Sequence, residues 1–142
     1  HFQFHIAALT EMGERLVRLN DYPNVHLYPG ISGENYEWLL NKCRIYLDIA
    51  YADEILDGNR MALEKGMILY AFEETCHRPN VYTKDHLFQK DAITDLIDEL
   101  SQLEDPKKYQ SAYDKQKMHP ALATKEELKR IVQMTENKEG KL

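Results

Sequence analysis

The sequence contains little cysteine and no long apolar segment. Its two cysteines, Cys43 and Cys76, fall at the end of a predicted helix and just after a predicted strand, which is not the pattern of a disulfide framework. We therefore expect two reduced thiols. No apolar run approaches the roughly 20 residues that a membrane-spanning helix needs, and no charged-then-apolar leader opens the chain. We expect a soluble protein of the cytoplasm, with any contact to a membrane made through partners.

The sequence also lacks a basic stripe and the local signatures of several enzyme classes. Its 18 basic and 24 acidic residues are mixed along the chain, so no surface is predicted to neutralise nucleic-acid phosphates. No G-x-G-x-x-G, G-x-S-x-G or P-loop pattern is present. No two histidines lie four residues apart on one predicted helix, and Cys76-His77 has no second pair near it. We predict no nucleic-acid partner, no metal site and no catalytic residue in this chain.

The pattern of apolar residues indicates alternating strands and helices in one globular unit. Of the 142 residues, 43% are hydrophobic, which is enough for a single core. β-type runs at 1–8, 25–28, 45–50 and 67–72 alternate with helical periodicity at 10–19, 32–43 and 54–65. The sequence therefore predicts an α/β fold with a Rossmann-like, doubly wound parallel sheet. Because the chain opens inside an apolar run, we expect that an upstream segment has been removed.

Beyond residue 72 the sequence predicts irregular structure as far as Asp91 and extra helices after it. Apolar residues recur at helical spacing over 93–103, and Asp105-Pro106 begins a further helix by the cap-then-proline rule. The segment 124–127 is a capping box for a last helix. We divide the chain into a Rossmann-like domain at 1–104 and a C-terminal helical extension at 105–142.

Polar residues gather in the loop after the third predicted strand. In open parallel sheets, ligands bind outside the carboxyl ends of the strands. Here Tyr51, Asp53, Glu54 and Asp57 coincide with a predicted helix N-terminus, whose unpaired N–H groups suit a diphosphate or sugar hydroxyls. In the alternative interpretation, Asp53 only caps the helix, while Glu54 and Asp57 complement its dipole.

A second candidate site follows the last core strand. Glu73, Glu74 and Thr75 could hold ribose hydroxyls, since a carboxylate accepts two hydrogen bonds from a vicinal diol. A solvated charged turn is the alternative. The loop histidines His77 and His86 have no visible partner in the sequence.

The order of these segments resembles the C-terminal domain of glycosyltransferases of the GT-B type. The resemblance rests on the strand at 25–28, the helix ending in NKCR at 41–44, the strand at 45–49, and the helix ending in ALEKG at 62–66. More narrowly, FHIAALTEM at 4–12, YPNVHLYP at 22–29, YLDI at 46–49 and AFEET at 71–75 are similar to one subunit type. This is the stabilising subunit that partners the accessory-Sec O-GlcNAc transferase of Gram-positive bacteria.

The resemblance implies a GT-B protein whose N-terminal Rossmann-like half is absent from this chain. It implies UDP or a UDP-sugar as the ligand, and no other cofactor. By position, the base would face Leu27, Tyr28 and Pro29, and the diphosphate and sugar would face Asp53, Glu54, Ile55 and Leu56.

One departure from the family pattern concerns a pair of acidic residues. Retaining GT-B enzymes often carry two, at a fixed spacing before a conserved glycine. Counting back from Gly66 places Asp53 at the first position and Met61 at the second, and a thioether does not replace a carboxylate as an acceptor for hydroxyls. The resemblance thus implies a noncatalytic subunit that stabilises the catalytic O-GlcNAc transferase and helps to bind its acceptor, a serine-rich repeat adhesin.

Two alternatives stay open at this point. An active glycosyltransferase would use Glu54 or Glu73 for a UDP-sugar donor, with its catalytic base in the missing half. A nucleotide-binding regulatory domain would bind a nucleotide tightly without any protein partner.

Overall fold

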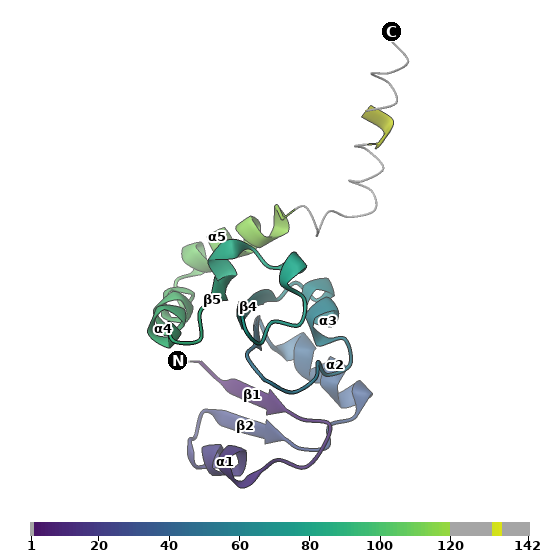
Figure 1. The fold of residues 1–142 in the computed structure, drawn as a ribbon, viewed down its shortest axis with the longest axis vertical. Helices are drawn as coiled ribbons and strands as arrows, with labels where there is room; N and C mark the ends of the chain where they lie inside the picture. The colour runs from purple at the N-terminus through teal and green to yellow at the C-terminus, as the bar shows by residue number, and fades with distance from the viewer. Residues whose placement is uncertain (1, 120–131, 135–142) are drawn as a thin grey trace.

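The computed structural model describes residues 2–119 and 132–134 (Figure 1). Its strands are parallel and form two groups. In the first, β1 (Phe4–Ala7) pairs with β2 (Val25–Tyr28), and in the second, β4 (Ile68–Phe72) lies between β3 (Ile45–Asp48) and β5 (Leu87–Phe88). The parallel α/β arrangement predicted from the sequence is confirmed. The capping box predicted at 124–127 lies outside the described residues.

Helices cover both faces of the β3–β5 group (Figure 1). The helices α2 (Gly33–Lys42) and α3 (Gly58–Glu64) lie on one side, and α4 (Ile93–Gln102) and α5 (Pro106–Lys117) lie on the other. Side chains alternate along β4, so Leu69 and Ala71 pack with α2 and α3, whereas Ile68 and Tyr70 pack with α4 and α5. Each buried aliphatic side chain contributes about 1.5–3 kcal/mol. This two-sided burial is the doubly wound arrangement that the apolar run at 67–72 predicts.

The amino end of β4 is completed by a side chain of α5. The backbone N–H of Leu69 donates to Oε1 of Gln116 at 2.8 Å, and Nε2 of Gln116 donates to the carbonyl of Met67 at 2.8 Å. A buried main chain needs partners for its polar groups, and β5 pairs only with the far end of β4. The side-chain amide of Gln116 therefore makes the two hydrogen bonds that a neighbouring strand would otherwise make here. These bonds hold α5 against the sheet.

The helix before Gly66 begins later than the sequence predicts. It starts at Gly58 rather than near residue 54, and residues 49–57 form a loop. Within that loop Leu56 and Asp57 have left-handed backbones, with φ of 44° and 62°. Asp57 rather than Asp53 is the N-cap residue, and its side chain makes no capping hydrogen bond. The prediction that Asp53 caps this helix is therefore wrong.

The late start has a tertiary cause. A Cβ atom added at Gly58 would lie 2.5 Å from the hydroxyl oxygens of both Tyr36 and Tyr46. The chain therefore enters α3 beneath two tyrosine rings, at a place where only glycine fits. The spacing of apolar residues along the sequence does not indicate this contact.

Two further segments differ from the prediction. The first helix is short, with α1 (Glu14–Val17) followed by a 3-10 turn, η1 (Arg18–Asp21). The segment between β4 and α4, which we expected to be irregular, contains two 3-10 turns, η2 (Pro79–Val81) and η3 (Lys84–His86), and the strand β5. A two-residue strand is too short to show an alternating pattern, so pairing with β4 alone defines it.

Candidate functional site

Asp48 ends β3 and is the centre of a buried polar cluster at the carboxyl edge of the sheet. Its side chain is 4% exposed, and a buried carboxylate is costly unless donors surround it. Oδ2 accepts hydrogen bonds from Nδ2 of Asn59 at 3.2 Å and from the backbone N–H of His77 at 2.8 Å. Oδ1 lies 2.7 Å from Nδ1 of His77. The carboxylate is thus held by three donors from two segments.

His77 connects this carboxylate to the loop after β3. Its Nε2 lies 2.8 Å from the carbonyl oxygen of Ala52, so each ring nitrogen faces an acceptor. Burial alone would lower the pKa of His77, but the hydrogen bonds to Asp48 and Ala52 outweigh it and raise the pKa above its ordinary value. The expectation that His77 has no partner is wrong, because its partners lie 25 and 29 residues away in the chain.

Asn59 joins α3 to the rest of the cluster and is fully buried. Its Nδ2 donates to Asp48 and also, at 2.8 Å, to Oε1 of Glu54, which accepts the backbone N–H of Asn59 as well. Its Oδ1 accepts from the hydroxyl of Tyr82. Thr75 adds a further link, since its Oγ1 donates to the carbonyl of Asp48 at 2.9 Å. Every polar atom of the Asn59 amide therefore has a partner.

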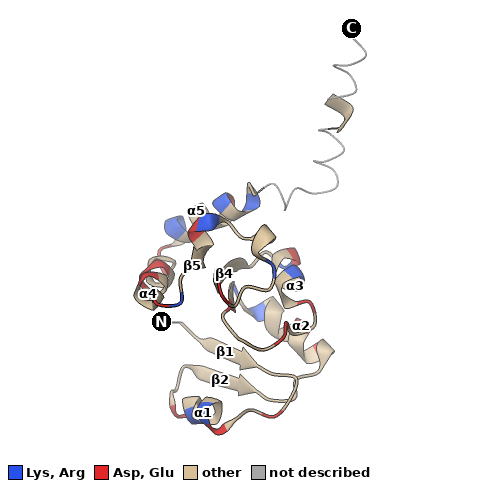
Figure 2. Cartoon of the chain, in the orientation of Figure 1, with Lys and Arg blue, Asp and Glu red and all other residues tan. Residues whose placement is uncertain are grey.

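Arg78 closes the cluster on its outer side. Its Nε donates to Oε2 of Glu54 at 3.2 Å, and its Nη2 pairs with Asp57, which also pairs with Arg60. Burial raises the pKa of Glu54, but hydrogen bonds from Asn59 and Arg78 more than offset this and lower it. Acidic and basic segments accordingly lie side by side around α3 (Figure 2). Glu54 is ionised, and both of its oxygens are occupied by the chain itself.

The remaining predicted ligand residues are spread around the cluster. Tyr51 is 76% exposed, Asp53 and Leu56 are also exposed, and Ile55 packs against the core. After β4, Glu73 accepts a hydrogen bond from Gln89, and Glu74 pairs with Lys90 at 3.4 Å. The structure thus brings Glu54, Asp57 and Thr75 together and leaves the other residues of these two loops at the surface. Their contacts with a ligand stay a prediction.

The residues predicted to face the base lie at the end of β2. The hydroxyl of Tyr28 lies 2.9 Å from Nδ1 of His5 on β1. Leu27 is partly buried, and Pro29 is exposed in the turn that follows. In the described part of the chain, no side-chain hydrogen bond joins any of the three to the Asp48 cluster, so base binding by this group also stays a prediction.

Sequence reasoning missed most of the cluster: Asp48, Asn59, Arg78 and Tyr82. One signal was available, since a carboxylate that ends an otherwise apolar strand, as Asp48 does, needs buried partners. Its partners come from α3 and from the segment around η2, and nothing in the sequence indicates that these approach β3.

Two expected absences can be examined in the part of the chain that the structure describes. No group of three or more histidine, cysteine or acidic side chains lies close enough there to hold a metal ion. No described helix is long and apolar enough to cross a membrane. Cys43 and Cys76 are free, and burial raises the pKa of Cys76 to about 11.

Comparison with known proteins places the chain in a family. Residues 1–116 match the model of the GftB/GlyA-F C-terminal domain. The chain is 43% identical over 89 residues to the stabilizing protein GtfB of the UDP-N-acetylglucosamine–peptide N-acetylglucosaminyltransferase of Limosilactobacillus reuteri, covering 63% of this chain and 20% of that protein. It is 32% identical over 131 residues to GtfB of Streptococcus agalactiae, covering 92% and 29%.

Glycosyltransferases are also among the relatives. The chain is 30% identical over 103 residues to the glycosyltransferase GlyF of Streptococcus pneumoniae, covering 72% of this chain and 26% of that protein. Among solved structures, the GtfA/B complex bound to UDP and GlcNAc matches with a TM-score of 0.80 and 30% identity, over 92% of this chain and 30% of the other.

The chain thus spans between a fifth and a third of the length of these proteins. The resemblance inferred from the sequence is confirmed, and the chain belongs to the GftB/GlyA-F C-terminal domain family.

Proposed function

We propose that this chain is the C-terminal part of a noncatalytic subunit that stabilises a peptide O-GlcNAc transferase. The observation that carries the proposal is the state of Glu54. Its carboxylate, one of the two that an active transferase would use for its donor, accepts two hydrogen bonds from Asn59 and one from Arg78. A carboxylate has about four acceptor positions, so the fold already uses three of them and leaves only one for a sugar hydroxyl.

The names of the relatives support the same function. Several are stabilizing proteins of a peptide N-acetylglucosaminyltransferase named GtfB, and one matching solved structure is the GtfA/B complex bound to UDP and GlcNAc. The proposed partner is accordingly the catalytic O-GlcNAc transferase subunit, and the proposed acceptor is a serine-rich repeat adhesin modified in the cytoplasm before accessory-Sec export. Any contact with the membrane would be made through these partners.

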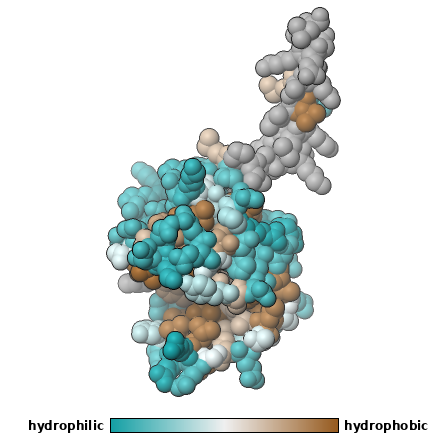
Figure 3. Space-filling view, viewed as in Figure 1, coloured by the Kyte–Doolittle hydropathy of each residue, from teal (hydrophilic) through white to brown (hydrophobic). Residues whose placement is uncertain are grey.

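Exposed apolar side chains offer a surface for such an assembly. Leu9 follows β1, Ile49 and Tyr51 follow β3, and Leu56 lies in the same loop, and each of the four is at least 40% exposed. Figure 3 shows hydrophobic residues gathered over the β1–β2 part of the molecule. Apolar groups at this edge are suited to burial against the remainder of the full-length protein.

The proposal is tested by co-expressing the full-length protein with its catalytic partner. The partner is expected to gain soluble yield and to unfold at a higher temperature than when it is expressed alone, because a bound subunit stabilises the folded state. An unfolding temperature and yield that do not change with the full-length protein present would contradict a stabilising role.

An active glycosyltransferase is the second candidate, and the relationship to GlyF favours it. In that case the exposed Glu73, whose only side-chain hydrogen bond among the described residues comes from Gln89, would serve the donor more readily than Glu54. Sugar transfer by the full-length protein without any partner separates this candidate from the first.

A further inference from the structure

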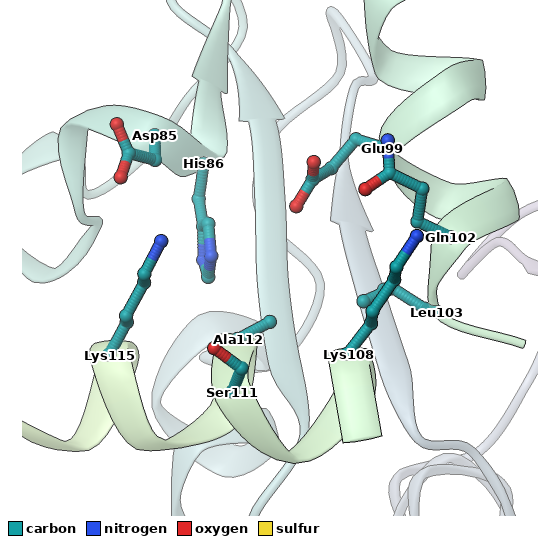
Figure 4. A pocket seen from close by; sticks show the side chains of 9 residues that line it. All are labelled: Asp85, His86, Glu99, Gln102, Leu103, Lys108, Ser111, Ala112 and Lys115. Carbon is teal, nitrogen blue, oxygen red and sulfur yellow. The ribbon is translucent and has the colours of Figure 1, made fainter. Parts of the chain in front are cut away.

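A pocket lies on the side of the sheet that α4 and α5 cover, away from the Asp48 cluster. It has a volume of about 190 Å³ and opens between η3, α4 and α5 (Figure 4). Its polar lining consists mainly of His86, Glu99, Gln102, Lys108, Ser111 and Lys115. His86 directly precedes β5, so the pocket faces the amino end of the parallel strands. It is therefore separate from the carboxyl-edge site considered above.

His86 lines this pocket and has one ring nitrogen without a partner among the described residues. Its side chain is 2% exposed, and its ring lies over that of Tyr70 with the centroids 4.3 Å apart. One ring nitrogen is hydrogen-bonded to the backbone of Leu69, whereas Nδ1 is buried and has no partner. Buried polar atoms without a partner are uncommon, and each calls for a ligand or a water molecule. Since the bond to Leu69 uses the ring proton, Nδ1 is left as an acceptor on a side chain that lines the pocket.

The helix α5 supplies the positive charge. The chain as a whole has a net charge of -6, yet α5 carries four lysines and a single aspartate (Figure 2). Lys108, Ser111 and Lys115 are spaced three and four residues apart, so they share the face that lines the pocket. Figure 4 shows both lysine side chains rising from α5 on either side of His86.

Two carboxylates, Asp85 and Glu99, also line the pocket. Glu99 accepts a hydrogen bond from the hydroxyl of Tyr70 at 3.1 Å, and Asp85 is exposed at the rim. Within the described residues, neither Lys108 nor Lys115 forms an ion pair with a carboxylate. Among the described residues, two ammonium groups, one hydroxyl and one imidazole nitrogen around this cavity thus have no hydrogen-bonding or ion-pair partner.

We propose that this pocket binds a small phosphate-type oxyanion, either inorganic phosphate or a phosphate ester. The ammonium groups of Lys108 and Lys115 and the hydroxyl of Ser111 donate to its oxygens, and a P–OH group donates to Nδ1 of His86. A protonated phosphate is both donor and acceptor, which matches this set of groups. Sulfate has no proton at neutral pH and leaves Nδ1 unpaired.

The test is a titration of the ¹⁵N-labelled 142-residue chain with potassium phosphate, and separately with potassium sulfate, at constant ionic strength. We expect saturable shifts of the His86 ring and of the α5 amides, with phosphate bound about tenfold more tightly than sulfate. Lys115→Met should weaken phosphate binding by about tenfold or more. Lys117→Met is the matched control, because that ammonium lies over the ring of Tyr113, 5.8 Å from its centroid, and does not line the pocket.

A further variant tests the role of the imidazole. His86→Phe keeps a ring against Tyr70 and should abolish the preference for phosphate over sulfate. If this buried variant does not fold, the comparison of Lys115→Met with Lys117→Met decides, because both of these residues are exposed. No saturable shift with phosphate, equal affinity for the two anions in the unmodified chain, or equal weakening by the two lysine variants would overturn the proposal.

Discussion

The Nε atom of Arg78 lies 3.2 Å from Oε2 of Glu54, although 24 residues separate the two in the chain. This contact ties the loop after β3 to the segment after β4, across the edge where parallel sheets bind ligands. Together with the bonds from Asn59, it leaves Glu54 with no free oxygen. One of the two carboxylates that an active transferase would use for its donor is thus engaged by the fold itself.

The amide of Asn59 should be a large contributor to stability. Asn59→Ala leaves Asp48, Glu54 and Tyr82 each without one buried partner, so we expect the free energy of unfolding to fall by about 2–4 kcal/mol. Urea denaturation monitored by circular dichroism measures the change. Asn41→Ala is the matched control, because Asn41 is exposed and bonds only to Lys65, and it should cost less than about 0.5 kcal/mol. Similar losses for both variants would refute the role of the cluster.

Stability should fall on the alkaline side because of His77. Its pKa is raised in the folded state, so its contribution is fully present below the unfolded value near 6.5 and is lost as the pH rises through the folded pKa. His77→Gln should remove this alkaline loss. The pKa of His5 is lowered, chiefly by burial and by His26, so His5 costs stability as the pH falls. His5→Gln should therefore change only the acid side of the profile, and a shared alkaline effect would contradict the assignment.

Gly58 should tolerate no side chain. Gly58→Ala places a methyl group 2.5 Å from the hydroxyls of Tyr36 and Tyr46, and such overpacking costs about 1–3 kcal/mol. Gly13→Ala is the control, since no atom lies within 4 Å of the added Cβ and its φ is -66°. That change should be neutral or slightly stabilising in thermal unfolding. A neutral Gly58→Ala would mean that the two rings move aside.

Much of the fold follows from the sequence, and the reasons for the failures are physical. The run at 67–72 predicts β4 because burial on both faces demands continuous apolar residues. Asp105-Pro106 predicts the start of α5 because a cap and a proline at N1 act locally. The periodicity at 54–65 predicts a helix that starts near residue 54, whereas α3 starts at Gly58, beside two tyrosines that lie far away in the sequence. The partners of Asp48 are equally remote in the chain.

Gln116 should control the attachment of α5. Gln116→Ala removes both hydrogen bonds to the amino end of β4, and we expect a loss of about 2–3 kcal/mol with faster hydrogen exchange at the Leu69 amide. Gln110→Ala on the same helix breaks only an exposed bond to Asp114 and should leave that amide protected. Unchanged exchange at Leu69 in Gln116→Ala would show that α5 is held by its apolar contacts alone.

The most direct test of the proposed function is a sugar-transfer assay with the purified full-length protein. It is incubated with radiolabelled UDP-N-acetylglucosamine and a serine-rich acceptor peptide, once alone and once with the catalytic subunit. A noncatalytic subunit predicts label in the peptide only when the catalytic subunit is present, at a higher level than that subunit produces by itself. Label transferred by the full-length protein alone, and lost on Glu73→Ala, would contradict the account and assign the protein to the active transferases.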